Sequence, residues 1–257
     1  MRSILGVVMA LMFVSYIPTK RKENNSAEKE NPKIEKKTSV AKVDSTQLLY
    51  EEMQLAPILK YAAFEQAMQG YQTLKPKRDQ VLTVIDFTLP SSEKRMVVLD
   101  MEHKKVLFHS LVSHGKNSGD KYARSFSNRN GSHQSSLGFF ETEGTYQGGN
   151  GYSLVLNGLE KGINDQAKAR AVVVHGANYC SEDFVRSTGR LGRSYGCPAL
   201  PRELTKPIIN TIKNGSLLFI YANNPQYMAS TKVVKNRPEG GLLAQHSLAS
   251  DSLGRLN

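Results

Sequence analysis

The feature that most constrains this chain is a histidine at the end of an apolar run, followed about twenty residues later by a cysteine between a glycine and a proline. Residues 171–174 read AVVV, a β-branched run typical of a buried strand, so we expect His175 at the end of a rigid element. The chain then reaches Cys197, where Gly196 frees the backbone and Pro198 restrains it. This arrangement places a base and a thiol on defined backbone.

These residue types predict nucleophilic catalysis by a cysteine. The thiolate is the attacking species, and a free thiol with a pKa of about 8.5 is mostly protonated at neutral pH, so a neighbouring base is needed. We interpret Cys197 as the nucleophile and His175 as the base. The N–H groups of Tyr195, Gly196 and Cys197 are expected to converge in a tight turn and form an oxyanion hole, which stabilises a tetrahedral intermediate by a few kcal/mol.

A resemblance becomes specific at these residues. The pattern HG, a connection of about twenty residues, then S-x-GC resembles the signature of the L,D-transpeptidase (YkuD-like) catalytic domain, which remodels bacterial peptidoglycan through a cysteine acyl-enzyme. The stretches GRLGRSYGCPAL and SLVLNGLEKGIND are similar to the divergent murein L,D-transpeptidase catalytic domain branch. The resemblance covers roughly residues 83–221. It implies a peptidoglycan stem peptide as donor, an amine of a neighbouring stem as acceptor, and no cofactor.

Carried over position by position, the resemblance assigns a role to five residues. It makes Cys197 the nucleophile and His175 its proton acceptor. It makes the Gly176 carbonyl the orienting partner of the other imidazole nitrogen. Ser194 and Gly196 match the frame of the family motif.

Two positions depart from that motif. The better-known members have a histidine where this chain has Tyr195, and an arginine where it has Ala199, so the usual ligand of the substrate carboxylate is missing. Arg190 or Arg193 can take over this contact, because a guanidinium pairs well with a carboxylate. The sequence does not choose between them. The alternative for each is a surface charge paired with one of the acids at 182–183.

Other interpretations remain open. Cys180 and Cys197 can form a disulfide in an exported protein, although we interpret Cys180 as a small buried apolar filler. A zinc site of His175, Cys197 and His133 lacks any C-x-x-C or H-x-x-x-H spacing, and we expect no metal. With water as acceptor the same site is an L,D-carboxypeptidase. A catalytically silent peptidoglycan-binding domain is favoured only by the two departures above.

The composition changes along the chain. Residues 1–18 are predicted to be a signal peptide or membrane anchor, which implies export to the periplasm or cell envelope. Residues 19–44 are predicted to be a disordered linker, and residues 225–257 a loose polar tail. The net charge of +11 suits an anionic envelope, and the lysines are scattered rather than interleaved with aromatics, so we expect no nucleic acid partner.

The periodicity predicts a helical extension over residues 45–78, divided at Pro57, and a catalytic domain over residues 79–224. The domain is expected to be mainly β, a YkuD-like β-sandwich or barrel with short helices. We expect strands at 81–89, 96–101, 106–112, 153–156, 171–174 and 216–221, with a hairpin joining the second to the third. Residues 114–157 are otherwise expected to be substrate-lining loops, apart from a strand entry at 135–140 that resembles the family's. Residues 205–214 are expected to form a helix capped by Thr205.

Overall fold

The structure is a computed structural model of the whole chain that describes residues 44–235. The expected signal or anchor segment, the linker up to residue 43 and the tail beyond residue 235 lie outside the described residues. In the described part, no helix is both long and apolar enough to cross a membrane.

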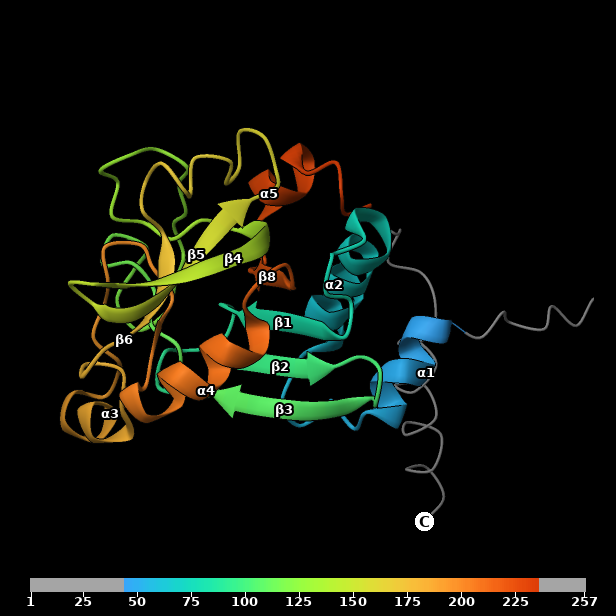
Figure 1. Cartoon of the computed structure of the whole chain (residues 1–257), viewed down its shortest axis with the longest axis horizontal. Helices are drawn as coiled ribbons and strands as arrows, with labels where there is room; N and C mark the ends of the chain where they lie inside the picture. Colours follow the sequence, from blue (N-terminus) through green and yellow to red (C-terminus); the bar gives the residue numbers. More distant parts are fainter. Residues whose placement is uncertain (1–43, 236–257) are drawn as a thin grey trace, which may run out of the picture. The chain divides into compact units, whose positions relative to one another are not determined.

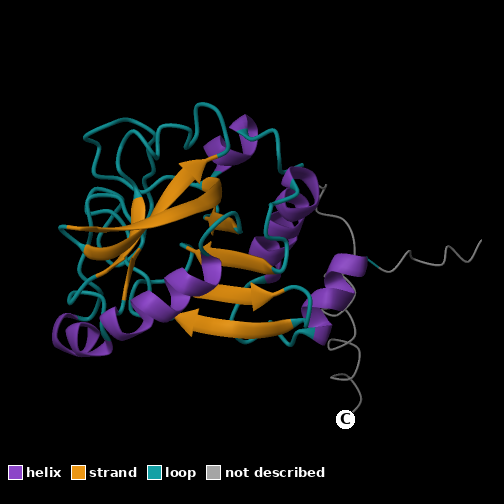
Figure 2. Ribbon diagram, viewed as in Figure 1, coloured by secondary structure: helices purple, strands orange, loops and turns teal. Residues whose placement is uncertain are grey.

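An eight-stranded sheet forms the framework (Figures 1 and 2), with the strand order β3-β2-β1-β8-β4-β5-β6-β7. The strands are β1 (Val81–Asp86), β2 (Met96–Asp100), β3 (Lys105–Ser110), β4 (Gly138–Gly148), β5 (Gly151–Gly158), β6 (Val173–Gly176), β7 (Ala199–Leu200) and β8 (Leu217–Tyr221). The pairs β1–β8 and β6–β7 are parallel, and the other neighbours are antiparallel. The expected mainly β fold is confirmed, including the β2–β3 hairpin.

The segment that follows β3 connects the two ends of this strand order. Ser113 forms an antiparallel bridge with Ala199 of β7, and Gly115 a parallel bridge with Ser194. The N–H of Lys116 donates to the Ser194 carbonyl at 2.8 Å. The sheet is therefore nearly closed, as the barrel prediction requires, and the segment before β7 is held at the closure.

Five helices surround the sheet in the described part: α1 (Ser45–Glu52), α2 (Tyr61–Leu74), α3 (Glu182–Thr188), α4 (Arg202–Ile212) and α5 (Pro225–Ser230). The first two lie in the segment 45–78 that was expected to be helical, with Pro57 between them. Helix α2 lies against β1 and β8 and buries Phe64 in the hydrophobic core of the sheet. Helix α4 lies against β1, β5 and β6 through an apolar face that includes Ile208 and Ile212.

Two segments are more regular than expected. Beyond the expected strand entry at 135–140 and strand at 153–156, β4 and β5 form one long hairpin, closed by the pair Gly148 and Gly151 around a two-residue turn. Helix α3 lies in the connection after β6, where the Ser181 side chain accepts the N–H of Phe184 as an N-cap. Both have turn or cap signals in the sequence that the prediction passed over.

Helix α4 differs from the prediction in its bounds, and helix α5 was not predicted. Helix α4 begins at Arg202, and Thr205 is not its cap, because the Thr205 hydroxyl lies inside the first turns and donates to the Pro201 carbonyl at 2.8 Å. Helix α5 occupies the start of the expected loose tail. Its Tyr227 is buried in the core, and the Tyr227 hydroxyl donates to the Glu160 carboxylate at 3.2 Å.

Candidate active site

The Cys197 thiol lies in the turn between α3 and β7, and it is half-buried and free of any disulfide. The sulfur donates to the Ala171 carbonyl at 3.7 Å and accepts the N–H of Val173 at 3.5 Å. Within residues 44–235 these are its hydrogen bonds, and the His175 ring is not among its partners. Burial raises the pKa of the thiol, whereas the Val173 N–H and the Arg170 charge lower it.

The turn that presents the thiol depends on Ser194 and Gly196. The Ser194 hydroxyl accepts the Gly196 N–H at 3.0 Å and donates to the Cys197 carbonyl at 2.6 Å. Gly196 has a φ of +128°, and a Cβ there would lie 2.9 Å from the Gln134 carbonyl oxygen, so only glycine fits.

This geometry changes the expected oxyanion hole. The Gly196 N–H is occupied by Ser194, which makes Ser194 a framework residue of the turn. The N–H groups of Tyr195 and Cys197 have no protein acceptor among the described residues. The free donors are therefore two rather than the three expected from the sequence.

His175 lies near the end of β6, with only 4% of its surface exposed. Its Nδ1 is 3.1 Å from the Gly176 carbonyl, so Nδ1 carries the hydrogen and Nε2 is left as the acceptor. Because β6 and β7 pair in parallel register, the His175 backbone lies beside Ala199, two residues after Cys197. Burial lowers the pKa of His175, with a contribution from the Arg202 charge. The imidazole is neutral at neutral pH, as a base must be.

Cys180 has a different environment. It is fully buried in a small apolar cluster with Leu111, Ala177, Leu191 and Ala199. Burial raises the pKa of the Cys180 thiol to about 12. Both thiols are free, so the alternative of a Cys180–Cys197 disulfide is wrong for this structure.

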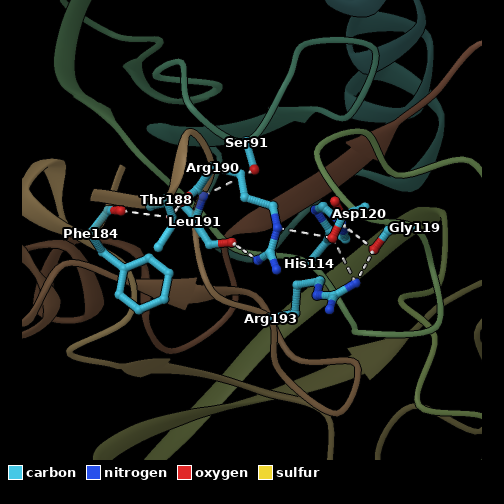
Figure 3. A network of polar contacts seen from close by, with 9 residues as sticks. All are labelled: Ser91, His114, Gly119, Asp120, Phe184, Thr188, Arg190, Leu191 and Arg193. Atoms are coloured by element: carbon cyan, nitrogen blue, oxygen red, sulfur yellow. Dashed lines mark hydrogen bonds and ion pairs between the residues drawn. The ribbon is translucent and has the colours of Figure 1, made fainter. Parts of the chain in front are cut away.

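The two arginines expected to hold substrate share one carboxylate (Figure 3). Arg190 Nε lies 2.9 Å and Arg193 Nη1 3.1 Å from Asp120 Oδ1. The acids expected as their alternative partners, Glu182 and Asp183, instead pair with Arg186. One carboxylate faces two guanidiniums, so the three side chains together retain an excess of positive charge. The Asp120 side chain is 69% exposed.

A buried network contacts Gly119, the residue before Asp120. His114 Nδ1 accepts from Arg95 Nη2 at 2.8 Å. His114 Nε2 is 3.3 Å from the Gly119 carbonyl, which also accepts from Arg193 (Figure 3). Arg95 is 1% exposed and also donates to the Val112 carbonyl. Burial, together with the Arg95 charge, lowers the pKa of His114 to about 4. His114 therefore stays neutral.

Arg170 was not identified from the sequence. It precedes β6, and its guanidinium donates to the carbonyls of Ser127 and Gln134 and to the hydroxyls of Ser132 and Ser136. No motif marks it, because its partners are backbone and hydroxyl groups of a loop more than thirty residues earlier.

Tyr195 is the exposed face of the turn, at 69% exposure. Its ring lies 4.6 Å from the His133 ring and 4.4 Å from the Lys116 ammonium. His133 is thus engaged by Tyr195. In residues 44–235, no group of three or more His, Cys, Asp or Glu side chains is arranged to hold a metal ion.

The best-defined cavity of the described part does not contain the thiol. It has a volume of about 620 Å³ and is lined by residues that include Phe126, Lys161 and Tyr227. Neither Cys197 nor His175 lines it. The nucleophile turn therefore lies outside this cavity.

Comparisons with known proteins identify the domain. A family model for the L,D-transpeptidase catalytic domain matches residues 55–221. No curated protein matches the chain. Among solved structures, an L,D-transpeptidase from Mycobacterium smegmatis is 17% identical, with 56% of this chain and 59% of that chain covered and a TM-score of 0.35. The helical cell shape determining protein Pgp2 from Campylobacter jejuni is 13% identical, with 61% and 50% covered and a TM-score of 0.39. An L,D-transpeptidase from Stackebrandtia nassauensis is 14% identical, with 70% and 77% covered and a TM-score of 0.34.

Proposed function

We propose that this chain, which belongs to the L,D-transpeptidase catalytic domain family because the family model spans most of it, is an exported cysteine L,D-transpeptidase of peptidoglycan. The family acts on peptidoglycan substrates. The observation that carries the proposal is the half-buried Cys197 thiol, which lies in a turn with two free N–H groups. His175, neutral and oriented by the Gly176 carbonyl, lies on β6, the strand that pairs with β7 just after this turn.

The proposed reaction has two acyl-transfer steps. His175 Nε2 takes the Cys197 proton as the sulfur attacks the carbonyl of the residue that precedes the terminal D-amino acid of a stem peptide. The C–N bond breaks, and the D-amino acid leaves with the proton from His175. An amine of a neighbouring stem then attacks the thioester, loses its proton to His175, and releases the thiol as the new amide forms.

The resting charge states support this order of events. Burial raises the pKa of Cys197 and lowers that of His175, so the resting pair is a neutral thiol and a neutral imidazole. The sulfur donates to the Ala171 carbonyl, a contact that only the protonated thiol can make. The proton must therefore leave during attack, which requires the sulfur to turn from Ala171 towards His175.

The tetrahedral intermediate needs donors for its oxyanion. We assign this role to the N–H groups of Tyr195 and Cys197. Arg190 and Arg193 are proposed to hold a substrate carboxylate, supported by the excess of positive charge around Asp120.

Two alternatives differ in outcome rather than in site. If water replaces the acceptor amine, the enzyme is an L,D-carboxypeptidase; if no acylation occurs, the domain only binds peptidoglycan. Incubation with defined muropeptides, followed by mass spectrometry, separates them. Crosslinked dimers support the transpeptidase, trimmed tripeptides the carboxypeptidase, and unchanged muropeptides the binding domain. Cys197→Ala is the negative control and Cys180→Ala the matched control that keeps the nucleophile.

Export is part of the proposal, because peptidoglycan is assembled outside the cytoplasm. Residues 1–18 would supply the signal or anchor. Fusion of residues 1–44 to a reporter active only after export tests it, with deletion of residues 1–18 from the same fusion as control. Reporter activity that is independent of residues 1–18 would contradict export by this segment.

A further inference from the structure

Arg170 connects the loop before β4 to the nucleophile turn. Its Nη1 donates to the Ser127 carbonyl at 2.6 Å and to the Ser136 hydroxyl at 2.7 Å. Its Nη2 donates to the Gln134 carbonyl at 2.7 Å and to the Ser132 hydroxyl at 3.2 Å. All four hydrogens of the two terminal nitrogens are thus used to hold residues 127–136 together.

The loop that Arg170 holds is in contact with the nucleophile turn. The Gln134 carbonyl lies where a side chain at Gly196 would point, and that side chain would begin 3.5 Å from Arg170 Nη2. The Ser135 hydroxyl donates to the Gly196 carbonyl at 3.1 Å. Removal of Arg170 would loosen the support of the residue next to Cys197.

The backbone that carries Arg170 also contacts the sulfur. Ala171, the next residue, has a φ of +53°, a left-handed conformation that is uncommon for alanine. Its carbonyl accepts from Cys197 Sγ, and the Val173 N–H donates to the same sulfur. The segment 170–173 therefore forms one side of the thiol's environment.

Arg170 differs from the other arginines near the site in its charge balance. Arg190 and Arg193 pair with Asp120, whereas no carboxylate in residues 44–235 pairs with Arg170. Its guanidinium is half-buried among neutral carbonyls and hydroxyls. A half-buried cation without a counter-ion stabilises an anion that forms near it. Near Arg170 that anion is the Cys197 thiolate.

We propose that Arg170 is a positioning residue that holds the 127–136 loop against Gly196 and stabilises the Cys197 thiolate with its charge. The proposal rests on the role of Cys197 as the nucleophile. Arg170 needs no contact with substrate to act in this way, because its hydrogen-bond donors are already occupied.

The electrostatics agree with the geometry. The Arg170 charge lowers the pKa of the Cys197 thiol, against the larger effect of burial, which raises it. Tyr179 is another titratable group that interacts with this thiol; burial raises its pKa to about 12, so it is neutral at neutral pH. His175 is also neutral. Removal of the Arg170 charge should therefore raise the pKa of the Cys197 thiol.

The test measures the thiol directly. The pH dependence of Cys197 alkylation by iodoacetamide is followed in a Cys180→Ala background for the parent, Arg170→Met and Arg170→Lys. Arg129→Met is the matched control, because Arg129 is an exposed arginine of the same loop and loses the same charge. We expect Arg170→Met to raise the apparent thiol pKa by about one unit, so that alkylation at pH 7 slows about tenfold, and Arg129→Met to leave it unchanged.

Arg170→Lys separates charge from shape. It keeps the charge but not the four-donor fork, so we expect a thiol pKa near that of the parent and a loss of turnover. Equal thiol pKa shifts in Arg170→Met and Arg129→Met, or an unchanged pKa in a folded Arg170→Met, would overturn the proposal. If Arg170→Met does not fold, Arg170→Lys with a shifted thiol pKa and parental turnover overturns it equally. Because alkylation needs no peptidoglycan, failure of the proposed function would leave this result readable.

Discussion

The two cysteines of this chain are seventeen residues apart and differ in how far they are enclosed. Cys180 is enclosed by apolar side chains, and burial raises the pKa of its thiol to about 12. Burial also raises the pKa of Cys197, and at both thiols a hydrogen bond and an arginine charge counteract this effect: Ser113 and Arg95 at Cys180, Val173 and Arg170 at Cys197. The comparison teaches that the two thiols differ mainly in exposure, because Cys180 is fully enclosed whereas Cys197 is only half-buried.

The apolar cluster around Cys180 nevertheless packs against the turn that carries Cys197. Leu191 and Ala199 belong to the cluster, and they flank the turn on its two sides. Cys180 thus packs against the two ends of the segment that presents the nucleophile. One cysteine is expected to act through packing, the other through chemistry.

The largest expected effect comes from the nucleophile. Cys197→Ala or Cys197→Ser should lower turnover of muropeptides by about 10³-fold or more, because no other group can form the thioester. Cys180→Ala should keep activity and lose about 1 kcal/mol of unfolding free energy through the lost packing. Mass spectrometry of products and denaturant unfolding measure the two effects. Equal damage to activity by both substitutions would break the comparison.

The next effect concerns the base. His175→Ala should reduce kcat/KM by about 10²- to 10⁴-fold and slow alkylation of Cys197 near neutral pH, because no neutral imidazole then accepts the proton. His103→Ala is the control, since His103 is exposed and pairs with Asp100 away from the site. An unchanged alkylation rate in His175→Ala would remove His175 from the mechanism.

The pH profile sharpens the same point. Burial lowers the pKa of His175 from its ordinary 6.5, so the imidazole stays neutral at pH 6.5 and the acid limb of kcat/KM should have its midpoint below that value. The alkaline limb should report the raised thiol pKa of the coupled pair. Steady-state rates between pH 4 and 11 measure both limbs. An acid midpoint above pH 6.5 would contradict a buried base.

His114 provides the corresponding test on stability. Its folded-state pKa of about 4 lies below the unfolded value of 6.5. The folded protein therefore binds this proton less well, so the contribution is complete above pH 6.5 and is lost as the pH falls from 6.5 to about 4. The loss should be about 3 kcal/mol of unfolding free energy. Urea unfolding at a series of pH values measures it, and His114→Asn, which keeps an acceptor for Arg95, should flatten that slope.

The sequence predicted the elements of the site whose signals are local. The β-branched run before His175 predicts a strand, and the Gly-Cys-Pro sequence around Cys197 predicts a thiol on restrained backbone. Each signal lies within a few residues. Arg170 gave no signal, because its role depends on carbonyls that only the folded chain brings to it. The pairing of Arg190 with Asp120 likewise joins segments seventy residues apart. Long-range placement of this kind is invisible to periodicity and motif spacing.

The smallest expected effect lies at the arginine pair on the rim of the Cys180 cluster. Arg190 and Arg193 flank the buried Leu191, and Asp120 competes with any substrate carboxylate for their guanidiniums. Asp120→Asn should release both and lower KM for a tetrapeptide donor by about threefold, whereas Arg190→Lys or Arg193→Lys should raise it, because an ammonium cannot form the bidentate fork. These pairs are partly exposed, which keeps the effect small.

Asp183→Asn, which removes an acid that pairs with Arg186 on α3, is the matched control. Parental KM in both Arg→Lys variants and in Asp120→Asn would place the carboxylate contact elsewhere, and the open, aromatic side of the turn at Tyr195 and Lys116 would be the next surface to test.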